Sequence, residues 1–235
     1  MVLTLIRRVA VVGLLATFAL VACGDSEATQ RKAFIEFLQT RIVDKPGLHV
    51  PQPTEEQTKS FGPYGTDYGI ILAFNDGMDK NVSGRMQQVF QKGMMRSLSD
   101  LMTRRDDLST ASEGMRTLRA ALDAELTRAD AAHAALKQPD ALKSVYDKAY
   151  EKAVTAPATA FKDGFPVIDG ALQAAQNLGN FLDQHRDAIK INGSTIQTTD
   201  PKLNNELNNL IGALTRNGQA VFDAQRKLQA TIRGS

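Results

Sequence analysis

The segment LSTASEGMRTLRAALDAELTRADAAHAAL, residues 108–136, shows the strongest periodicity in the chain. Its apolar positions, with one histidine among them, advance by three or four residues throughout, which is the spacing of one helix face. These positions are Leu108, Ala111, Met115, Leu118, Leu122, Leu126, Ala129, His133 and Leu136. The segment predicts a long amphipathic helix that starts with Ser109 or Thr110 as its N-cap and ends at residues 138–140.

Further segments repeat this spacing on both sides. They cover residues 30–42, 64–92, 161–189 and 203–232, with a shorter one at 142–153. A proline inside a helix loses a hydrogen bond and clashes with the preceding turn. We therefore expect breaks at residues 45–47, 61–63 and 156–157, and a bend or a new start at Pro166. Residues 94–107 fit a short helix or a loop.

Local signals mark several element ends. Thr54 with Gln57 predicts a capping box, and Asp200 before Pro201 predicts the start of the last helix. The only strand signal is at residues 189–196, where Asn192-Gly193 would supply the two positive φ angles of a type I′ turn. Two strands alone are marginally stable, so this hairpin must pack on the helices.

The fold class follows from these segments together. Short connections between long amphipathic helices make neighbouring helices antiparallel. Aromatic residues make up 6% of the chain and Trp is absent, which favours helix-on-helix packing. The sequence predicts an all-α protein, an elongated antiparallel up-and-down helical bundle of about four long helices, with shorter flanking helices and one small β-hairpin near residues 189–198.

The N-terminus carries an independent signal. Arg7 and Arg8 precede an uncharged apolar run at residues 9–20, which leads into the only cysteine of the chain, Cys23. At about 1.5 Å per residue this run reaches about 18 Å, short of the roughly 30 Å hydrocarbon core of a bilayer. It predicts a cleaved secretory signal peptide rather than a membrane-spanning helix.

The end of this run, Leu20-Val21-Ala22-Cys23, resembles a bacterial lipobox. The resemblance implies that Cys23 becomes the new N-terminus and carries diacylglycerol and an amide-linked acyl chain such as palmitate. Several acyl chains give stable anchoring where one does not. The alternative for a lone cysteine is an inert buried thiol, but the position behind a signal-like run favours lipidation. We expect a signal peptide at 1–22, a lipidated cysteine and polar tether at 23–29, and a helical bundle domain at 30–235.

These features predict a cell-envelope lipoprotein that is anchored to a membrane and faces the periplasm. Gly24 follows the cysteine where enterobacterial inner-membrane lipoproteins carry aspartate, so the outer membrane is favoured over the inner membrane. Asp25, one position later, bears on the same choice in some other bacteria.

The charge balance excludes one class of partner. Without Arg7 and Arg8, the 28 Lys and Arg residues of the chain fall to 26, equal to its 26 Asp and Glu residues. A chain with balanced charge and no long run of one sign lacks the electrostatic signature of a nucleic-acid-binding protein. No cysteine remains for a disulfide, so the fold must hold by packing alone.

Several stretches resemble the YiaF-like family of proteobacterial lipoproteins. They are Gln30-Arg-Lys-Ala-Phe-Ile-Glu-Phe-Leu-Gln39, Phe61-Gly-Pro-Tyr-Gly-Thr-Asp-Tyr68 and Ala129-Asp-Ala-Ala-His-Ala-Ala-Leu-Lys-Gln138, with continuing similarity at 142–158 that becomes diffuse after about Gly179. The resemblance implies a lipobox and a helical body. The family is a domain of unknown function, so no catalytic or ligand residue carries over.

His133 is the main candidate for a metal ligand. Asp130 and His133 lie one turn apart, which is half of the acidic-x-x-His arrangement of di-metal bundles. The other half is missing, because Leu182 stands three residues before His185. A core histidine that hydrogen-bonds to a neighbour is the favoured interpretation, and we expect no metal and no cofactor.

Other clusters have simple structural interpretations. The aromatic residues Phe34, Phe37, Phe61, Tyr64 and Tyr68 could line a pocket for an acyl chain, but core packing is favoured. A methionine-rich stretch comprises Met78, Met86, Met94, Met95 and Met102; it suits packing first and an adaptable partner surface or soft metal second. Arg104-Arg105-Asp106-Asp107 predicts a solvated, mutually compensating charge cluster.

No hydrolase, phosphate-binding or zinc motif occurs in the chain. The sequence therefore predicts a non-enzymatic lipoprotein of unknown molecular function, a periplasmic interaction or structural protein with an envelope protein as partner. The alternative is a carrier or binder of a lipid or other apolar ligand between the helices. An enzyme with an unmarked carboxylate pair ranks third.

Overall fold

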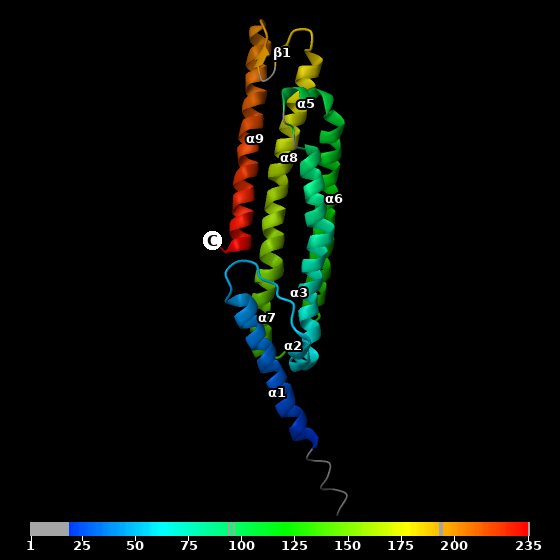
Figure 1. Cartoon of the computed structure of the whole chain (residues 1–235), viewed down its shortest axis with the longest axis vertical. Helices are drawn as coiled ribbons and strands as arrows, with labels where there is room; N and C mark the ends of the chain where they lie inside the picture. The colour runs from blue at the N-terminus through cyan, green and yellow to red at the C-terminus, as the bar shows by residue number, and fades with distance from the viewer. Residues whose placement is uncertain (1–18, 94, 96, 193–194, 235) are drawn as a thin grey trace, which may run out of the picture.

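The structure, a computed structural model, describes residues 19–93, 95, 97–192 and 195–234, with side chains from residue 26 onward except those of Leu98 and Asn192. It confirms the predicted all-α class: long antiparallel helices form an elongated bundle with one small hairpin (Figure 1). The elements are α1 (Ala19–Leu38), η1 (Gln39–Val43), α2 (Glu55–Ser60), η2 (Gly62–Tyr64), α3 (Gly65–Gly77), η3 (Met78–Ser83), α4 (Gly84–Gly93), α5 (Leu98–Thr103), α6 (Arg105–Ala134), α7 (Asp140–Tyr150), η4 (Glu151–Thr155), α8 (Ala156–Gln184), β1 (Lys190–Asn192), β2 (Thr195–Gln197) and α9 (Pro201–Arg233).

Helices α7 and α8 form one unbroken rod through the π-helical segment η4, so the expected break at Ala156–Pro157 is wrong. The Ala156 N–H donates to the Glu151 carbonyl, one residue further back than in an α-helix. The extra residue places Pro157 in the first turn of α8, where its missing N–H costs little. The rod from residue 140 to 184 is therefore roughly 65 Å long.

Pro166 also lies inside α8 and neither starts nor ends a helix. A proline in a helix interior costs about 3 kcal/mol. Its neighbours Phe165 and Leu172 are buried, and burying each large apolar side chain recovers about 1.5–3 kcal/mol. Packing of this face outweighs the lost hydrogen bond, while the ring of Pro166 stays exposed.

Helix α6 begins at Arg105, before both expected N-caps. The Thr110 hydroxyl donates to the Asp106 carbonyl at 2.8 Å, so it bonds inside the helix instead of capping it. Asp106 and Asp107 fill the first turn, where their charge complements the helix dipole. Within residues 94–107, for which the sequence allowed a short helix or a loop, the structure has the short helix α5.

Other predicted ends are confirmed. Thr54 and Gln57 form the reciprocal capping box, and the Asp200 carboxylate accepts from the N–H groups of Lys202 and Leu203. The turn at 45–47 uses Gly47 at φ 65°, and a 3₁₀ turn at Gly62–Tyr64 starts the long helix that continues through η3 to Gly93.

Residues 24–29, the expected tether, lie within α1.

The hairpin is present, but its turn lies one residue later than expected. Asn192 pairs with Thr195, so the two connecting residues are Gly193 and Ser194, which lie outside the described residues. This register places Ile191 opposite Ile196, on one face. Both side chains pack against the core, so the hairpin does lean on the bundle.

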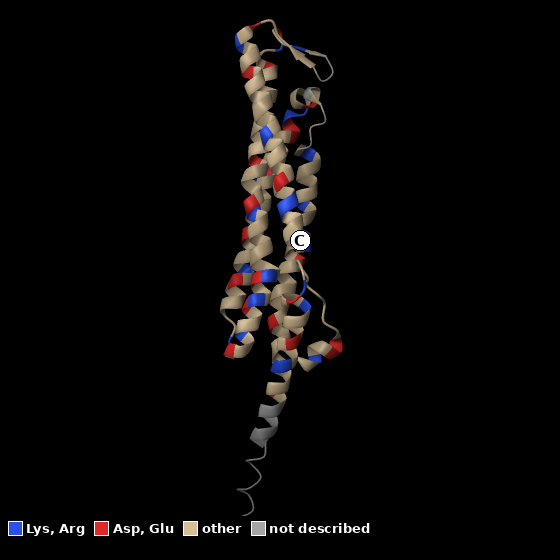
Figure 2. Cartoon of the chain, turned by 90° about the vertical axis from the view of Figure 1, so that its left-hand side faces the viewer, with Lys and Arg blue, Asp and Glu red and all other residues tan. Residues whose placement is uncertain are grey.

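The long helices are arranged as an arc. Helix α9 packs on α8, α8 on α6, and α6 on α4, while α5 covers the upper part of α8. Helix α1 joins α7 at the lower end of the molecule (Figure 1). Basic and acidic residues are both spread along the helices (Figure 2).

The end of α9 meets the loop that follows α1. The Leu48 N–H donates to the Ile232 carbonyl at 2.8 Å. Beside this contact, Lys152 of η4 donates through Nζ to the carbonyls of Val43, at 2.9 Å, and of Lys45. A cation placed at the last carbonyls of a helix offsets their partial negative charge. Lys152 therefore ties the end of η1 to the α7–α8 rod.

We predict that Gly179→Ala destabilises the protein. A Cβ at this position would lie 2.5 Å from the backbone carbonyl oxygen of Leu101, so α5 must move away from α8. Overpacking of this kind costs about 1–3 kcal/mol. Gly164→Ala, in the same helix with nothing within 4 Å, is the control; it should gain up to about 1 kcal/mol from helix propensity. Urea unfolding measures both, and equal effects would contradict the close contact.

We also predict that Lys152→Met lowers the free energy of unfolding by about 1–3 kcal/mol, because carbonyls near the end of η1 lose a charged donor. Lys148→Met, one turn earlier on an exposed position, should change it by less than about 0.5 kcal/mol. Thermal or urea unfolding of the two variants provides the comparison. A Lys152→Met protein as stable as the control would show that the contact contributes little.

Candidate functional site

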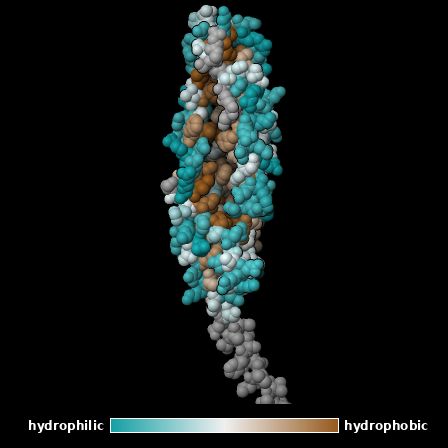
Figure 3. Space-filling model, viewed as in Figure 1, coloured by the Kyte–Doolittle hydropathy of each residue, from teal (hydrophilic) through white to brown (hydrophobic). Residues whose placement is uncertain are grey.

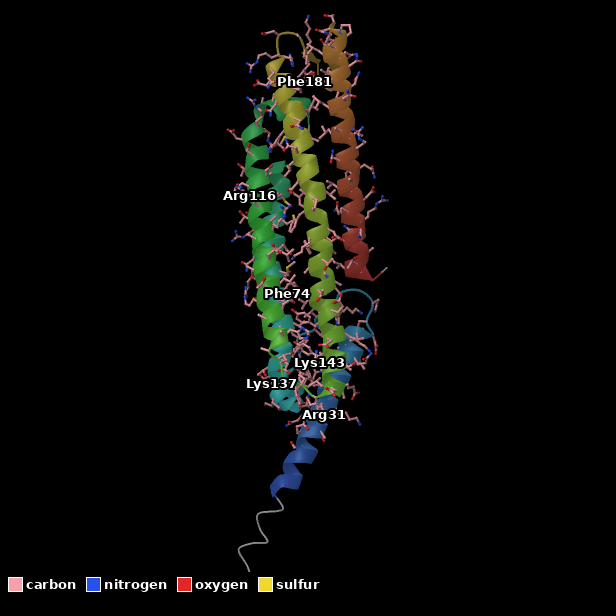
Figure 4. The ribbon with its side chains drawn as sticks, turned by 180° about the vertical axis from the view of Figure 1, so that it is seen from behind. Arg31, Phe74, Arg116, Lys137, Lys143 and Phe181 are labelled. Carbon is pink, nitrogen blue, oxygen red and sulfur yellow. The ribbon has the colours of Figure 1, made fainter. Side chains whose placement is uncertain are left out.

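The stretches that carry the family resemblance converge at the lower end of the bundle, where α1 enters. Arg31, Lys137 and Lys143 mark this end in Figure 4. The rings gathered here come from α1, η2, α3, α6 and α7, with Phe61 just before η2. We call them the basal cluster: Phe34, Phe37, Phe61, Tyr64, Tyr68, His133, Tyr146 and Tyr150.

The basal cluster is a packed core. The centroid of the Phe61 ring lies 5.2 Å from that of Phe34 and 5.0 Å from that of Phe37, and Tyr68 meets Phe37 edge-on at 5.2 Å. These are the separations of favourable aromatic pairs. All five candidate aromatic residues are at most 9% exposed, which confirms the core interpretation over an acyl-chain pocket.

Each of the four tyrosine hydroxyls of the cluster donates to a defined acceptor, and that of Tyr64 donates to Glu27 Oε1. Tyr68 donates to the Pro51 carbonyl, Tyr146 to the Asp67 carbonyl and Tyr150 to Asp130 Oδ1, each at 2.7 Å. Burial raises the pKa of all four phenols, and the Asp130 carboxylate adds to the rise at Tyr150. The hydroxyls therefore stay protonated and hold neighbouring segments together.

His133 hydrogen-bonds to a neighbour, as predicted, but it is half-buried at the edge of the core instead of lying inside it. Its Nε2 lies 2.8 Å from Asp147 Oδ1, and its ring stacks on Tyr150 at 4.1 Å. Burial opposes ionisation of Asp147, but hydrogen bonds from Lys143 and His133 outweigh it, so the Asp147 pKa lies below its usual value. Asp130 bonds to Tyr150 instead of sharing a site with His133.

Within the described residues, no three His, Cys, Asp or Glu side chains are grouped so that they could hold a metal ion. His185, the other histidine considered, packs its ring 4.7 Å from that of Phe181.

The methionine and charge clusters behave mainly as predicted. Met78 is buried, and Met86, Met95 and Met102 pack against the core, whereas Met94 lies outside the described residues. In the charge cluster, Arg104 pairs with Asp107 at 2.8 Å. Arg105 instead reaches Asp183 of α8 at 2.9 Å, so the charges are only partly compensated within the cluster.

Glu125 is a buried acid that the periodicity missed. The sequence pattern assigned Leu126 to the buried face, but Glu125 is 5% exposed and Leu126 is only partly buried. Asn81 of η3 donates to its Oε1 at 2.8 Å, and the Arg128 guanidinium lies 2.7 Å from Oε2 without hydrogen-bond geometry. Positions 118, 122, 125 and 129 advance by three or four residues as regularly as positions 118, 122, 126 and 129 do. The periodicity therefore could not tell whether residue 125 or residue 126 is buried.

The sequence did indicate a buried contact for Lys152, because this lysine lies on the apolar stripe of its helix. A lysine in such a position needs acceptors, and the carbonyls at the end of η1 supply them. Nothing in the sequence indicated a tertiary contact for Glu27. Its Oε1 accepts from the Tyr64 hydroxyl and lies 3.0 Å from the Arg31 guanidinium, which joins the first turns of α1 to the basal cluster.

The lipobox residues can be placed only by their backbone. Leu20, Val21, Ala22 and Cys23 belong to the first turns of α1, while their side chains and the signal-peptide residues 1–18 lie outside the described residues. In the described part of the chain, no helix combines the length and apolar character that crossing a membrane requires.

Together, these contacts fix α1 to the lower end of the bundle. Rings from segments between residues 34 and 150 pack together, the tyrosine hydroxyls hydrogen-bond across segment boundaries, and Glu27 connects this core to the residues that directly follow Cys23.

Comparison with known proteins identifies relatives for nearly the whole chain. The family model described as "Protein of unknown function (DUF3053)" matches residues 11–229. The uncharacterized protein YiaF of Escherichia coli K12 is 32% identical over 212 residues, which cover 90% of this chain and 89% of YiaF. The YiaF proteins of Escherichia coli O157:H7 and Shigella flexneri match equally well.

No solved structure shows significant similarity to the chain. The match extends the resemblance beyond Gly179, where it looked diffuse, and into α9. This chain belongs to the DUF3053 family, whose YiaF members share most of its length.

Proposed function

We propose that this protein is a lipid-anchored cell-envelope protein that presents its helical rod to another envelope protein. Cys23 carries the acyl chains after cleavage behind Leu20, Val21 and Ala22. The body faces the periplasm, on the outer membrane in preference to the inner membrane. The observation that carries the proposal is the lipobox-like tetrapeptide at the end of a short apolar run that follows Arg7 and Arg8.

The course of α1 supports this proposal. The helix runs from Ala19 through Cys23 without interruption, and Glu27, one turn beyond the cysteine, already contacts Tyr64. An anchor at Cys23 would thus lie about 6 Å along the helix from the first tertiary contact. A lipid there would hold the lower end of the rod close to the membrane surface.

The shape of the bundle suits a structural or interaction role. From a lower end held at the membrane, the rod of α7 and α8 would reach roughly 65 Å into the periplasm. Basic and acidic residues are interspersed along the helices in nearly equal numbers, so we propose a protein partner and no nucleic acid. We propose no enzymatic activity, no cofactor and no metal.

The alternative, a carrier of a lipid or other apolar ligand, has less support. The aromatic side chains that could have lined its pocket are packed against one another at the basal cluster.

We predict that Cys23→Ala abolishes incorporation of labelled palmitate and leaves an uncleaved or mislocalised precursor in a bacterial host. The reason is that the substitution removes the thiol that receives the first lipid. Ser26→Ala, three residues later, is the control and should label and localise like the wild type. A wild-type protein that takes up no labelled fatty acid would overturn the anchoring proposal.

We further predict that photo-reactive amino acids on exposed positions crosslink the protein to a specific envelope protein in living cells. Thr117 on α6 and Lys137 at the lower end are exposed and suitable. The same probes in the Cys23→Ala background are the control, and their adducts should be lost with the location. If no position gives a reproducible adduct with another protein, the interaction role is contradicted.

A further inference from the structure

The arc of long helices does not close. Helix α9 packs extensively on α8 alone among the described elements, and α4 packs on α6 and η3. In a closed four-helix bundle the first and last helices would also pack on each other. Figure 3 shows the result on this face, an apolar strip that runs along the molecule between hydrophilic margins.

Helix α4 turns an apolar residue towards this opening. Val89 is buried at Gly114 of α6, and Gly93 faces Leu172 of α8, whose Cδ2 would lie 3.1 Å from an added Cβ. At 100° per residue, Gly93 lies about 40° round the helix from Val89, and Phe90 lies about 100° round in the same sense. Around the axis of α4, the directions to α6, to α8 and to Phe90 therefore follow in this order. Phe90 points past α8 on the side away from α6, and it is 41% exposed.

Helix α9 is left largely uncovered. Leu207 is the only described residue of α9 that is buried, although the helix carries an apolar stripe along its whole length. Ile211 and Phe222 lie about three turns apart on one side of that stripe. Ile211 is partly buried and Phe222 is 64% exposed. A large aromatic side chain at this exposure, on an amphipathic helix, lacks the partner surface that such helices usually have.

We infer that a second copy of this chain covers the strip, with α9 of each copy lying along the open face of the other. The molecule carries both halves of such an interface: an apolar strip that no helix covers, and a helix with exposed apolar side chains. A two-fold interface requires this self-complementarity.

The size of the strip fits this occupant. A strip along α9 that is about 50 Å long and as wide as one helix, about 10 Å, has an area of roughly 500 Å² per copy. Two copies together then bury roughly 1,000 Å², which is the lower bound for a specific protein interface. A single acyl chain would cover less than half of that length, so a helix matches the strip better than one lipid does.

The test is the mass of the full-length protein in a density-matched detergent, measured by sedimentation equilibrium. We expect two chains per particle. Phe222→Glu and Phe90→Glu should each weaken association at least tenfold, because each places a charge in the apolar contact. Both residues are exposed enough for the fold to survive, which circular dichroism checks. Thr117→Glu adds the same charge on an exposed position of α6 and should stay dimeric.

A wild-type protein that remains monomeric at about 100 μM would overturn the inference, and so would a dimer that neither substitution weakens. A monomer that carries bound lipid in native mass spectrometry would also overturn it and would assign the strip to lipid. None of these outcomes depends on whether Cys23 is acylated, so failure of the anchoring proposal remains distinguishable.

Discussion

The fold depends on the continuity of the helix that runs from α7 through η4 into α8. This rod passes two prolines and contacts elements from both ends of the molecule: α1 at the lower end, α6 and α9 along its length, and α5 near the top. The π turn at Glu151–Thr155 makes continuity possible, because it shifts Pro157 into the first turn of the resumed helix.

The π-helical segments also position the polar contacts of the interior. Segment η4 carries Lys152 to the end of η1, and segment η3 carries Asn81 to the buried carboxylate of Glu125. An extra residue in a helical turn rotates the side chains that follow, so a polar group can enter a face that is otherwise apolar. Such turns often accompany functional sites, and here they connect helices distant in sequence.

The two ends of the molecule differ in how completely they are packed. At the lower end, aromatic rings, tyrosine hydroxyls and the His133–Asp147 pair close the core around α1. Higher up, α9 rests on one neighbour and leaves apolar surface exposed. Close packing at the end nearest Cys23, together with exposed apolar surface further away, suits a protein that is held at one end and makes contacts along its length.

The sequence by itself determined the class of fold, the positions of the long helices, several caps and the lipobox-like signal, because each depends on residues within a few turns of one another. It misjudged Pro157, which the π turn places in the first turn of α8, and it placed Leu126 where Glu125 is buried. The tertiary structure alone decided that Glu27 meets Tyr64, that Lys152 meets the end of η1, and that the arc stays open between α4 and α9. These contacts join residues far apart in the chain, and local periodicity carries no information about which helix faces lie opposite each other.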